Sequence, residues 1–239
     1  MDQGGHRGLQ PDGDSFRLQY GVVWGGFMGP ENEIVYIVDD DAMVRDGLSS
    51  LLRAKGKDVR LFACGTEFLK FERKDSAACL ILDLKMPGMN GLEVQTAVLA
   101  QISIPIIFIT GRGDIPSTVK AMKGGAIDFL TKPVDEAVLM AAVEDALRKD
   151  RTDRREALER ADLVSRYRSL TPREQEVLPL LTRGLLNKQV AAELGIAEYT
   201  VQIHRGNIMR KTKAGSFATL VKLAEKLGLE QPLPQGTDN

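Results

Sequence analysis

Short apolar segments alternate with segments of helical periodicity over residues 32–147. The apolar segments, rich in branched side chains, are residues 34–38, 59–62, 79–82, 106–109 and 129–130. Segments with apolar residues three or four apart follow them, at residues 42–54, 65–72, 91–101, 115–124 and 135–147. Buried strands that alternate with helices are typical of a parallel sheet covered on both faces. The pattern therefore predicts an α/β doubly wound domain with a five-stranded parallel sheet.

Residues 168–229 lack strand-like alternation and carry helical patterns instead. Four short helices fit, at residues 172–182, 187–194, 198–211 and 217–227. The first of them begins with a capping box, formed by Thr171 at the N-cap and Glu174 at the third helical position. Pro172 at the first helical position is a further start signal. Gly195 ends the second and leaves only a short turn before the third, which is helix-turn-helix spacing. We predict an all-α four-helix domain that contains a helix-turn-helix.

The other segments are predicted to be a linker and two ends. Residues 148–167 are charged, free of Gly and Pro and rich in helix formers, so we expect an exposed helical linker. A dimerising coiled coil would need more apolar positions than Leu158 and Leu163 supply. Residues 1–31, with eight glycines in the first 30, are expected to form a disordered leader, with Met28 as the natural start. Residues 230–239 are expected to form a frayed tail.

Composition bounds the class of protein. The chain has 239 residues, 43% of them hydrophobic and 27% charged, which suits two small globular domains. No apolar run reaches the roughly 18 residues of a membrane span, and the start carries no secretion signal. Two cysteines, Cys64 and Cys79, are too few for a disulfide framework or a metal site, so we expect reduced thiols. A cytoplasmic location follows as the default.

The net charge of −1 hides an asymmetry between the two predicted domains. Residues 32–147 hold 13 Lys and Arg against 17 Asp and Glu, a net charge of −4. Residues 166–229 hold 11 against 5, a net charge of +6. A basic domain attached to an acidic one indicates that the basic part meets a polyanion, although basic faces are often merely solvated.

Three kinds of reactive side chain stand at the ends of four predicted strands. Asp39 and Asp40 follow the first strand, Asp83 the third, Thr110 the fourth, and Lys132 the fifth. Because the carboxyl ends of parallel strands line one crevice, we expect these side chains to gather there. Carboxylates so close together repel one another unless a cation lies between them, and Mg²⁺ prefers such oxygen ligands. The set meets the needs of phosphoryl transfer: a nucleophile, a divalent cation, an ammonium and a hydroxyl.

The helix predicted at residues 198–211 has two faces. A stripe toward the core consists of Val201, His204, Ile208 and Thr212. The opposite side, which would meet the major groove, carries Tyr199, Gln202, Ile203, Gly206 and Arg210. Flanking cations suited to phosphates are Arg205, Lys211 and Lys213, with Lys188 on the preceding helix. These features predict a recognition helix for double-stranded DNA.

Residues 32–147 resemble the flavodoxin-like receiver domain of bacterial two-component response regulators. The resemblance rests on Val38-Asp39-Asp40, the run from Leu82 to Gly91, Thr110-Gly111 and Lys132-Pro133. It implies that Asp83 is the phosphoacceptor for a sensor histidine kinase. It also implies that Asp39, Asp40, Asp83 and the backbone carbonyl of Lys85 bind Mg²⁺, and that the peptide before Pro133 is cis. Thr110 and Phe129 would form the switch, with Lys132 paired to the phosphoryl group.

Residues 168–229 resemble the LuxR-type output domain, so the whole chain is similar to the FixJ subfamily of the FixJ/NarL family. The matching stretches are 170–174, 187–191, 200–204 and 207–211. The resemblance implies base contacts from Gln202, Ile203 and Gly206. The DNA-binding set expected overall is Lys188, Thr200, Gln202, Ile203, Arg205, Gly206, Arg210 and Lys211. It also implies a homodimer on phosphorylation, bound to promoter DNA and near RNA polymerase, that activates transcription.

Two other functions fit parts of the pattern. An aspartyl phosphatase of the haloacid-dehalogenase type would need a second Asp two residues after the nucleophile, and that position is Lys85. We therefore expect no enzyme beyond self-phosphorylation and autodephosphorylation of the receiver. A phosphorylation-dependent adaptor that binds protein instead of DNA remains an alternative, separable by the salt dependence of binding to duplex DNA.

Overall fold

The computed structural model describes residues 33–111 and 115–229. The leader expected at residues 1–31, the start expected at Met28 and the tail expected at residues 230–239 lie outside the described residues. Over the described ranges, no helix combines the length and apolar character needed to cross a membrane.

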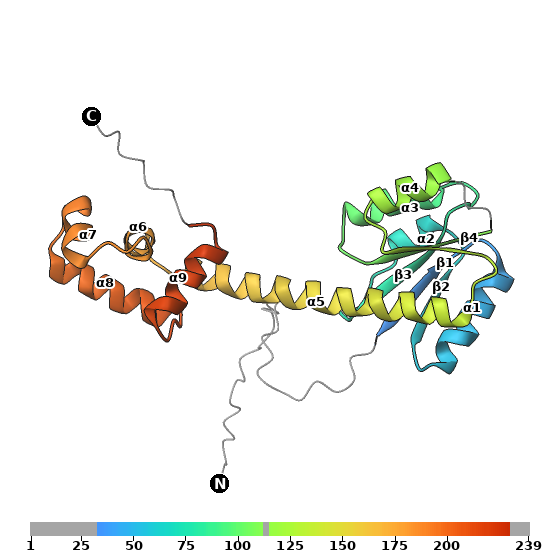
Figure 1. Ribbon diagram of the computed structural model, residues 1–239, viewed down its shortest axis with the longest axis horizontal. Coiled ribbons are helices and arrows are strands. Elements are labelled where there is room, and N and C mark those ends of the chain that lie inside the picture. Colours follow the sequence, from blue (N-terminus) through green and yellow to red (C-terminus); the bar gives the residue numbers. More distant parts are fainter. Residues whose placement is uncertain (1–32, 112–114, 230–239) are drawn as a thin grey trace, which may run out of the picture. The chain divides into compact units, whose positions relative to one another are not determined.

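The five predicted strands form one parallel sheet (Figure 1). They are β1 (Ile34–Val38), β2 (Asp58–Phe62), β3 (Ala78–Asp83), β4 (Ile106–Thr110) and β5 (Asp128–Thr131). Their order across the sheet is β2-β1-β3-β4-β5, and every neighbouring pair is parallel. β1, β3 and β4 are buried along their whole length, which explains their unbroken apolar sequence. The predicted fold class is confirmed.

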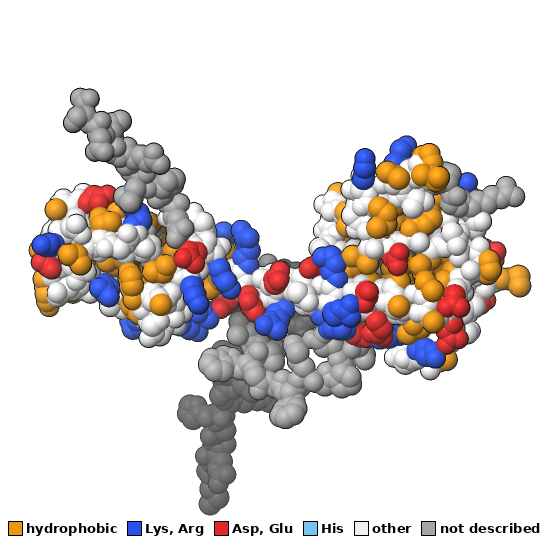
Figure 2. All heavy atoms as spheres, in the orientation of Figure 1, with side chains coloured by type: hydrophobic (Ala, Val, Ile, Leu, Met, Phe, Trp, Pro, Cys, Tyr) orange, Lys and Arg blue, Asp and Glu red, His pale blue; other side chains and the backbone are white. Residues whose placement is uncertain are grey.

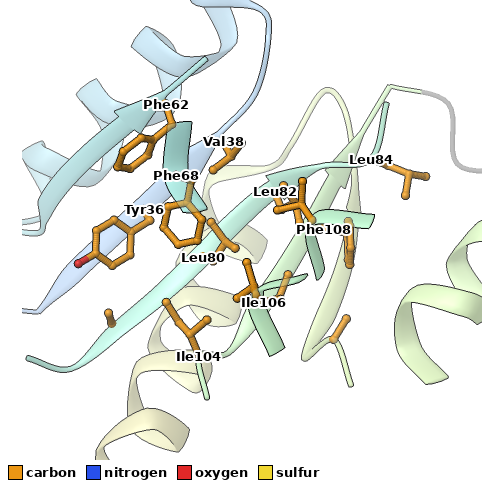
Figure 3. Close-up of a cluster of buried hydrophobic side chains, with 14 of the residues drawn as sticks. Tyr36, Val38, Phe62, Phe68, Leu80, Leu82, Leu84, Ile104, Ile106 and Phe108 are labelled. Atoms are coloured by element: carbon orange, nitrogen blue, oxygen red, sulfur yellow. The ribbon is translucent and has the colours of Figure 1, made fainter. Parts of the chain in front are cut away.

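Helices cover both faces of this sheet (Figure 1). One face packs against α2 (Gly65–Lys70), α3 (Gly91–Leu99) and α4 (Ile115–Lys123). Its core holds Tyr36, Phe62, Phe68 and Phe108, drawn in Figure 3. The other face packs against α1 (Ala42–Ala54) and the first turns of α5 (Glu136–Arg168). Two covered faces leave the strand ends as the exposed edges of the sheet.

Helix α5 is longer than the predicted pattern required. Its 33 residues join the helix predicted at 135–147 to the linker predicted at 148–167 without interruption. The expected exposure of that linker is wrong at Asp150, which is 3% exposed and accepts a hydrogen bond from the Ala78 amide at 2.9 Å. Farther along α5, Lys and Arg are interspersed with Asp and Glu, as Figure 2 shows. Because α5 is continuous across residues 147 and 148, the boundary predicted there between domain and linker stays a prediction.

The C-terminal residues form the four predicted helices around a separate apolar core. They are α6 (Pro172–Thr182), α7 (Asn187–Leu194), α8 (Glu198–Lys211) and α9 (Phe217–Lys226). The capping box of α6 is confirmed, because the Thr171 amide donates to Glu174 at 2.8 Å and the Glu174 amide donates to the Thr171 hydroxyl at 3.3 Å. Gly195 ends α7 in the left-handed conformation, with φ of 64°.

Candidate functional site

The strand register brings the predicted polar residues to one edge of the sheet. Val38 pairs with Leu82, so Asp39 lies beside Asp83 where β1 and β3 end. Thr110, the last residue of β4, pairs with Thr131 on β5, and Lys132 follows. The expected gathering of Asp39, Asp83, Thr110 and Lys132 at the carboxyl edge is therefore found.

Lys132 lies between the two buried carboxylates. Its Nζ is 2.6 Å from Asp39 Oδ2 and 2.8 Å from Asp83 Oδ1. The side chains of Asp39 and Asp83 are only 3% and 6% exposed. Two carboxylates and one ammonium do not balance, so this enclosed group retains negative charge.

The pKa shifts follow from that crowding. Burial raises the pKa of the Asp83 carboxyl above its ordinary value, and Asp39 adds to the rise, against the hydrogen bonds from Lys132 and Lys85. Burial alone would lower the pKa of Lys132, but its hydrogen bonds to Asp39 and Asp83 outweigh burial and raise it. The ammonium therefore stays charged at neutral pH, while the carboxylates lack enough positive charge around them.

Backbone groups hold both carboxylates in place. Asp83 Oδ2 accepts from the Lys85 amide at 2.7 Å, and Asp39 Oδ1 accepts from the Asp41 amide at 2.9 Å. The Lys132 amide donates to the Thr110 carbonyl at 2.8 Å, and the peptide bond from Lys132 to Pro133 is cis, as expected. Each charged group thus has a fixed direction, which a preorganised site requires.

Asp40 differs from its neighbours because it is exposed. Asp41, the third acid of the run, caps α1 by accepting from the Met43 amide at 2.8 Å. Among the described residues no group of three His, Cys, Asp or Glu stands close enough to hold a metal ion. Two buried carboxylates with unbalanced charge, and a third at the rim, are nonetheless hard oxygen donors that suit Mg²⁺.

Two residues were missed as contributors by reasoning from the sequence. Arg45, on α1, donates from Nη1 to the Asp39 carbonyl at 2.6 Å, a contact with a backbone atom that no pattern of side chains announces. Gly91 stands so close that an added Cβ would lie 2.4 Å from the Asp83 carbonyl oxygen. The only sign of this close approach in the sequence was the glycine itself, at the end of the run from Leu82 to Gly91.

Phe129, the expected switch residue, lies on β5 opposite Phe108 of β4. It is partly buried on β5, and its ring centroid is 6.3 Å from that of Phe108. Thr110 is 1% exposed at the end of the neighbouring strand. The two residues therefore lie on adjacent strands, with Phe129 two positions before Thr131, the residue that pairs with Thr110.

The two predicted faces of α8 are confirmed by burial. Val201, Ile208 and Thr212 are fully buried, and His204 is half-buried. The opposite side is exposed at Tyr199, Gln202, Ile203, Gly206 and Arg210. Tyr199 and Ile203 are large apolar side chains that remain 72% and 47% exposed. An exposed side of this composition suits contact with another molecule.

The flanking cations of α8 are not equally available. Lys211 Nζ is 2.6 Å from Glu174 Oε2, a carboxylate only 3% exposed, so this lysine secures α8 to α6. The Arg205 guanidinium lies 5.0 Å from the centroid of the Phe217 ring on α9. Lys188 and Lys213 are exposed, whereas Thr200 is half-buried. Figure 2 shows Lys and Arg side chains on the surface of this domain.

Comparison with known families agrees with both halves of the chain. Residues 35–144 match the response regulator receiver domain, and residues 168–224 match the bacterial regulatory proteins of the luxR family. A receiver joined to a DNA-binding domain defines a transcription regulator activated by phosphorylation. The chain belongs to the two-component response regulators with a LuxR-type output domain, the family of FixJ.

This chain matches several known proteins over nearly the whole length of each. Nodulation protein W of Bradyrhizobium diazoefficiens is 48% identical over 82% of this chain and 87% of its own. Response regulator protein TmoT of Ectopseudomonas mendocina is 47% identical over 84% and 91%. Transcriptional regulatory protein FixJ of B. diazoefficiens is 40% identical over 82% and 96%. The solved structure of response regulator StyR is 49% identical over 82% and 99%, with a TM-score of 0.75.

Proposed function

We propose that Asp83 accepts a phosphoryl group from the phosphohistidine of a sensor histidine kinase. The observation that carries the proposal is the pair of buried carboxylates joined by Lys132 at the carboxyl edge of the sheet. An Asp83 carboxylate oxygen attacks phosphorus while the phosphorus–nitrogen bond breaks. The imidazole nitrogen keeps the electron pair and takes a proton, and Asp83 becomes an acyl phosphate.

The other residues of the cluster have supporting roles in this proposal. Lys132 stays charged and neutralises the incoming phosphoryl oxygens, while Thr110 donates its hydroxyl to them. Asp39, Asp40, Asp83 and the Lys85 carbonyl hold Mg²⁺, which supplies the missing positive charge. Movement of Thr110 toward the phosphoryl group lets Phe129 turn inward. The receiver turns over no independent substrate.

We propose further that the phosphorylated protein dimerises, binds promoter DNA with two copies of α8 and activates transcription with RNA polymerase, in the cytoplasm. Residues 32–147 act as receiver, 148–167 as linker and 168–229 as output domain. Base contacts come from Gln202, Ile203 and Gly206, since all three lie on the exposed side of α8. Contacts to the phosphates of the DNA backbone come from five side chains: Lys188, Thr200, Arg205, Arg210 and, in part, Lys211.

The phosphoacceptor is tested with labelled acetyl phosphate and an Asp83→Asn variant. The parent protein should take up label in the presence of Mg²⁺, and chelation should abolish the uptake. Asp83→Asn should take up none, whereas the control Asp58→Asn, at the opposite end of a strand, should behave as the parent does. Equal labelling of Asp83→Asn would show that another residue accepts the phosphoryl group.

A further inference from the structure

A polar cavity lies at the end of the sheet opposite Asp83. It has a volume of about 190 Å³ and is lined by residues that include Tyr36, Arg73, Lys74, Ser76 and Arg154. Ala78, which also lines it, is the first residue of β3, and Asp83 is the last. The length of a strand therefore separates this cavity from the site of phosphoryl transfer.

The cations around this cavity differ in how they are balanced. Arg154 Nε is 2.9 Å from the buried Asp150 carboxylate, and its Nη1 also pairs with Asp75. Neither Arg73 nor Lys74 forms an ion pair or a side-chain hydrogen bond with any residue in the described ranges. Burial lowers the pKa of the Arg73 guanidinium; Tyr36 and Asp150 oppose the fall, and Arg154 adds to it. A partly desolvated cation without a partner is costly, so the cavity favours an anion.

The Ser76 hydroxyl is a second unpaired group in the same cavity. Its oxygen is buried and has no hydrogen-bond partner among the described residues. Buried hydroxyl groups in a folded protein generally have a hydrogen-bond partner, and leaving one unpaired destabilises the fold. Tyr36 also lines the cavity, and Figure 3 shows its hydroxyl pointing away from the rings of Phe62 and Phe68. The cavity therefore offers several hydrogen-bond donors beside two unbalanced cations.

We propose that this cavity binds a phosphoryl dianion, either inorganic phosphate or a small phosphate monoester. The Arg73 guanidinium presents a planar fork that matches two phosphoryl oxygens, and Lys74 and Ser76 supply further donors. Asp75 and Asp150 both pair with the single cation Arg154, but with Arg73 and Lys74 the lining holds three cations against these two carboxylates, so it keeps a net positive charge. A second cavity of about 210 Å³ shares Arg73 and is lined by Phe71 and Ile102, so it has room for the organic part of an ester.

The proposal is tested by titrating the full chain without Mg²⁺, at constant ionic strength, with inorganic phosphate and separately with phenyl phosphate. Amide resonances of residues 76–78 report on the cavity. Saturable shifts are expected with at least one of the two anions, and tighter binding of phenyl phosphate would identify an ester as the ligand. No saturable shift with either anion in the millimolar range would overturn the proposal and leave water as the occupant.

Three variants separate binding at this cavity from a general effect of charge. Arg73→Gln should weaken binding at least about tenfold, since it removes the charged fork. Arg60→Gln, which removes the same charge from an exposed arginine outside the cavity, should leave the affinity unchanged. Ser76→Ala should weaken binding about threefold or more while the ligand-free protein unfolds at the same or a higher temperature. Unchanged affinity in both cavity variants would contradict the proposal.

Discussion

Gly91 shows how one residue without a side chain shapes the phosphorylation site. A Cβ at this position would lie 2.4 Å from the Asp83 carbonyl oxygen and 2.9 Å from the Leu84 Cα. Both of these are backbone atoms, which cannot turn aside as a flexible side chain can. Gly91 also donates its amide to the Leu84 carbonyl at 3.0 Å. Helix α3 can therefore begin against the end of β3 only with glycine here.

A Gly91→Ala variant should destabilise the receiver by about 2 kcal/mol, because it forces the backbone after Asp83 to shift. Its uptake of label from acetyl phosphate should also be slower than that of the parent. Gly47→Ala is the matched control, since nothing lies within 4 Å of a Cβ there and α1 should gain up to about 1 kcal/mol. Thermal unfolding of both variants measures the difference, and a Gly91→Ala protein as stable as Gly47→Ala would disprove the close approach.

Glu174 gives the output domain a defined dependence on pH. Burial alone would raise the pKa of Glu174, but hydrogen bonds from Lys211 and Thr171 outweigh it and lower the pKa. A carboxyl with a lowered folded pKa stabilises the fold above its unfolded pKa, about 4.3, and this stabilisation is lost as pH falls through the folded value.

Glu174→Gln should therefore cost about 1–2 kcal/mol at neutral pH, because the charged partner of Lys211 is lost. The deficit should shrink as the pH falls below about 4, where the parent loses the same interaction. Amide exchange in α6 measures it in the full chain. Glu176→Gln is the control, since its carboxylate is 53% exposed and pairs only with Arg173 in the described structure. A deficit that persists at low pH would assign the effect to packing instead of charge.

At the scale of the secondary-structure elements, α8 begins without a side-chain cap. Ala197 occupies the N-cap position in an extended conformation and makes no capping hydrogen bond. Ala197→Ser should stabilise α8 by about 1 kcal/mol, since serine accepts from a free amide of the first turn. Slower amide exchange in that turn would demonstrate it. Ala192→Ser, exposed inside α7, should give no gain; equal gains at both positions would refute a capping effect.

Periodicity predicted the elements because strands and helices each impose a period on the sequence. It located all five strands to within about a residue, and the strand ends then located Asp39, Asp83 and Lys132 together. It failed where a side chain depends on a distant backbone atom. Asp150 accepts from an amide 72 positions away, and Lys211 pairs with a glutamate 37 positions away. Such distant pairs produce no periodic pattern in the sequence. Asp150 was therefore predicted to be exposed to solvent, and Lys211 was predicted to contact DNA.

At the scale of the whole molecule, charge is divided according to task. The receiver region is acidic, and two of its carboxylates surround the site where phosphate is proposed to arrive. The output region carries a net charge of +6, although Lys211 is committed to Glu174. Fewer Lys and Arg side chains are therefore available to contact DNA phosphates than the net charge suggests. Because the salt dependence of binding scales with the number of phosphate contacts, this number sets its upper limit.

Substitutions on the output domain should separate phosphate contacts from base contacts. Lys188→Gln should reduce the slope of log affinity against log salt by about 0.9, since one phosphate contact is lost. Gln202→Ala should leave that slope unchanged but relax sequence preference, costing about 1–3 kcal/mol on a preferred site. Duplexes selected from a random pool by phosphorylated protein supply that site. Lys222→Gln, exposed on α9, is the control; if it lowers the slope as much as Lys188→Gln does, DNA lies against a different face of the domain.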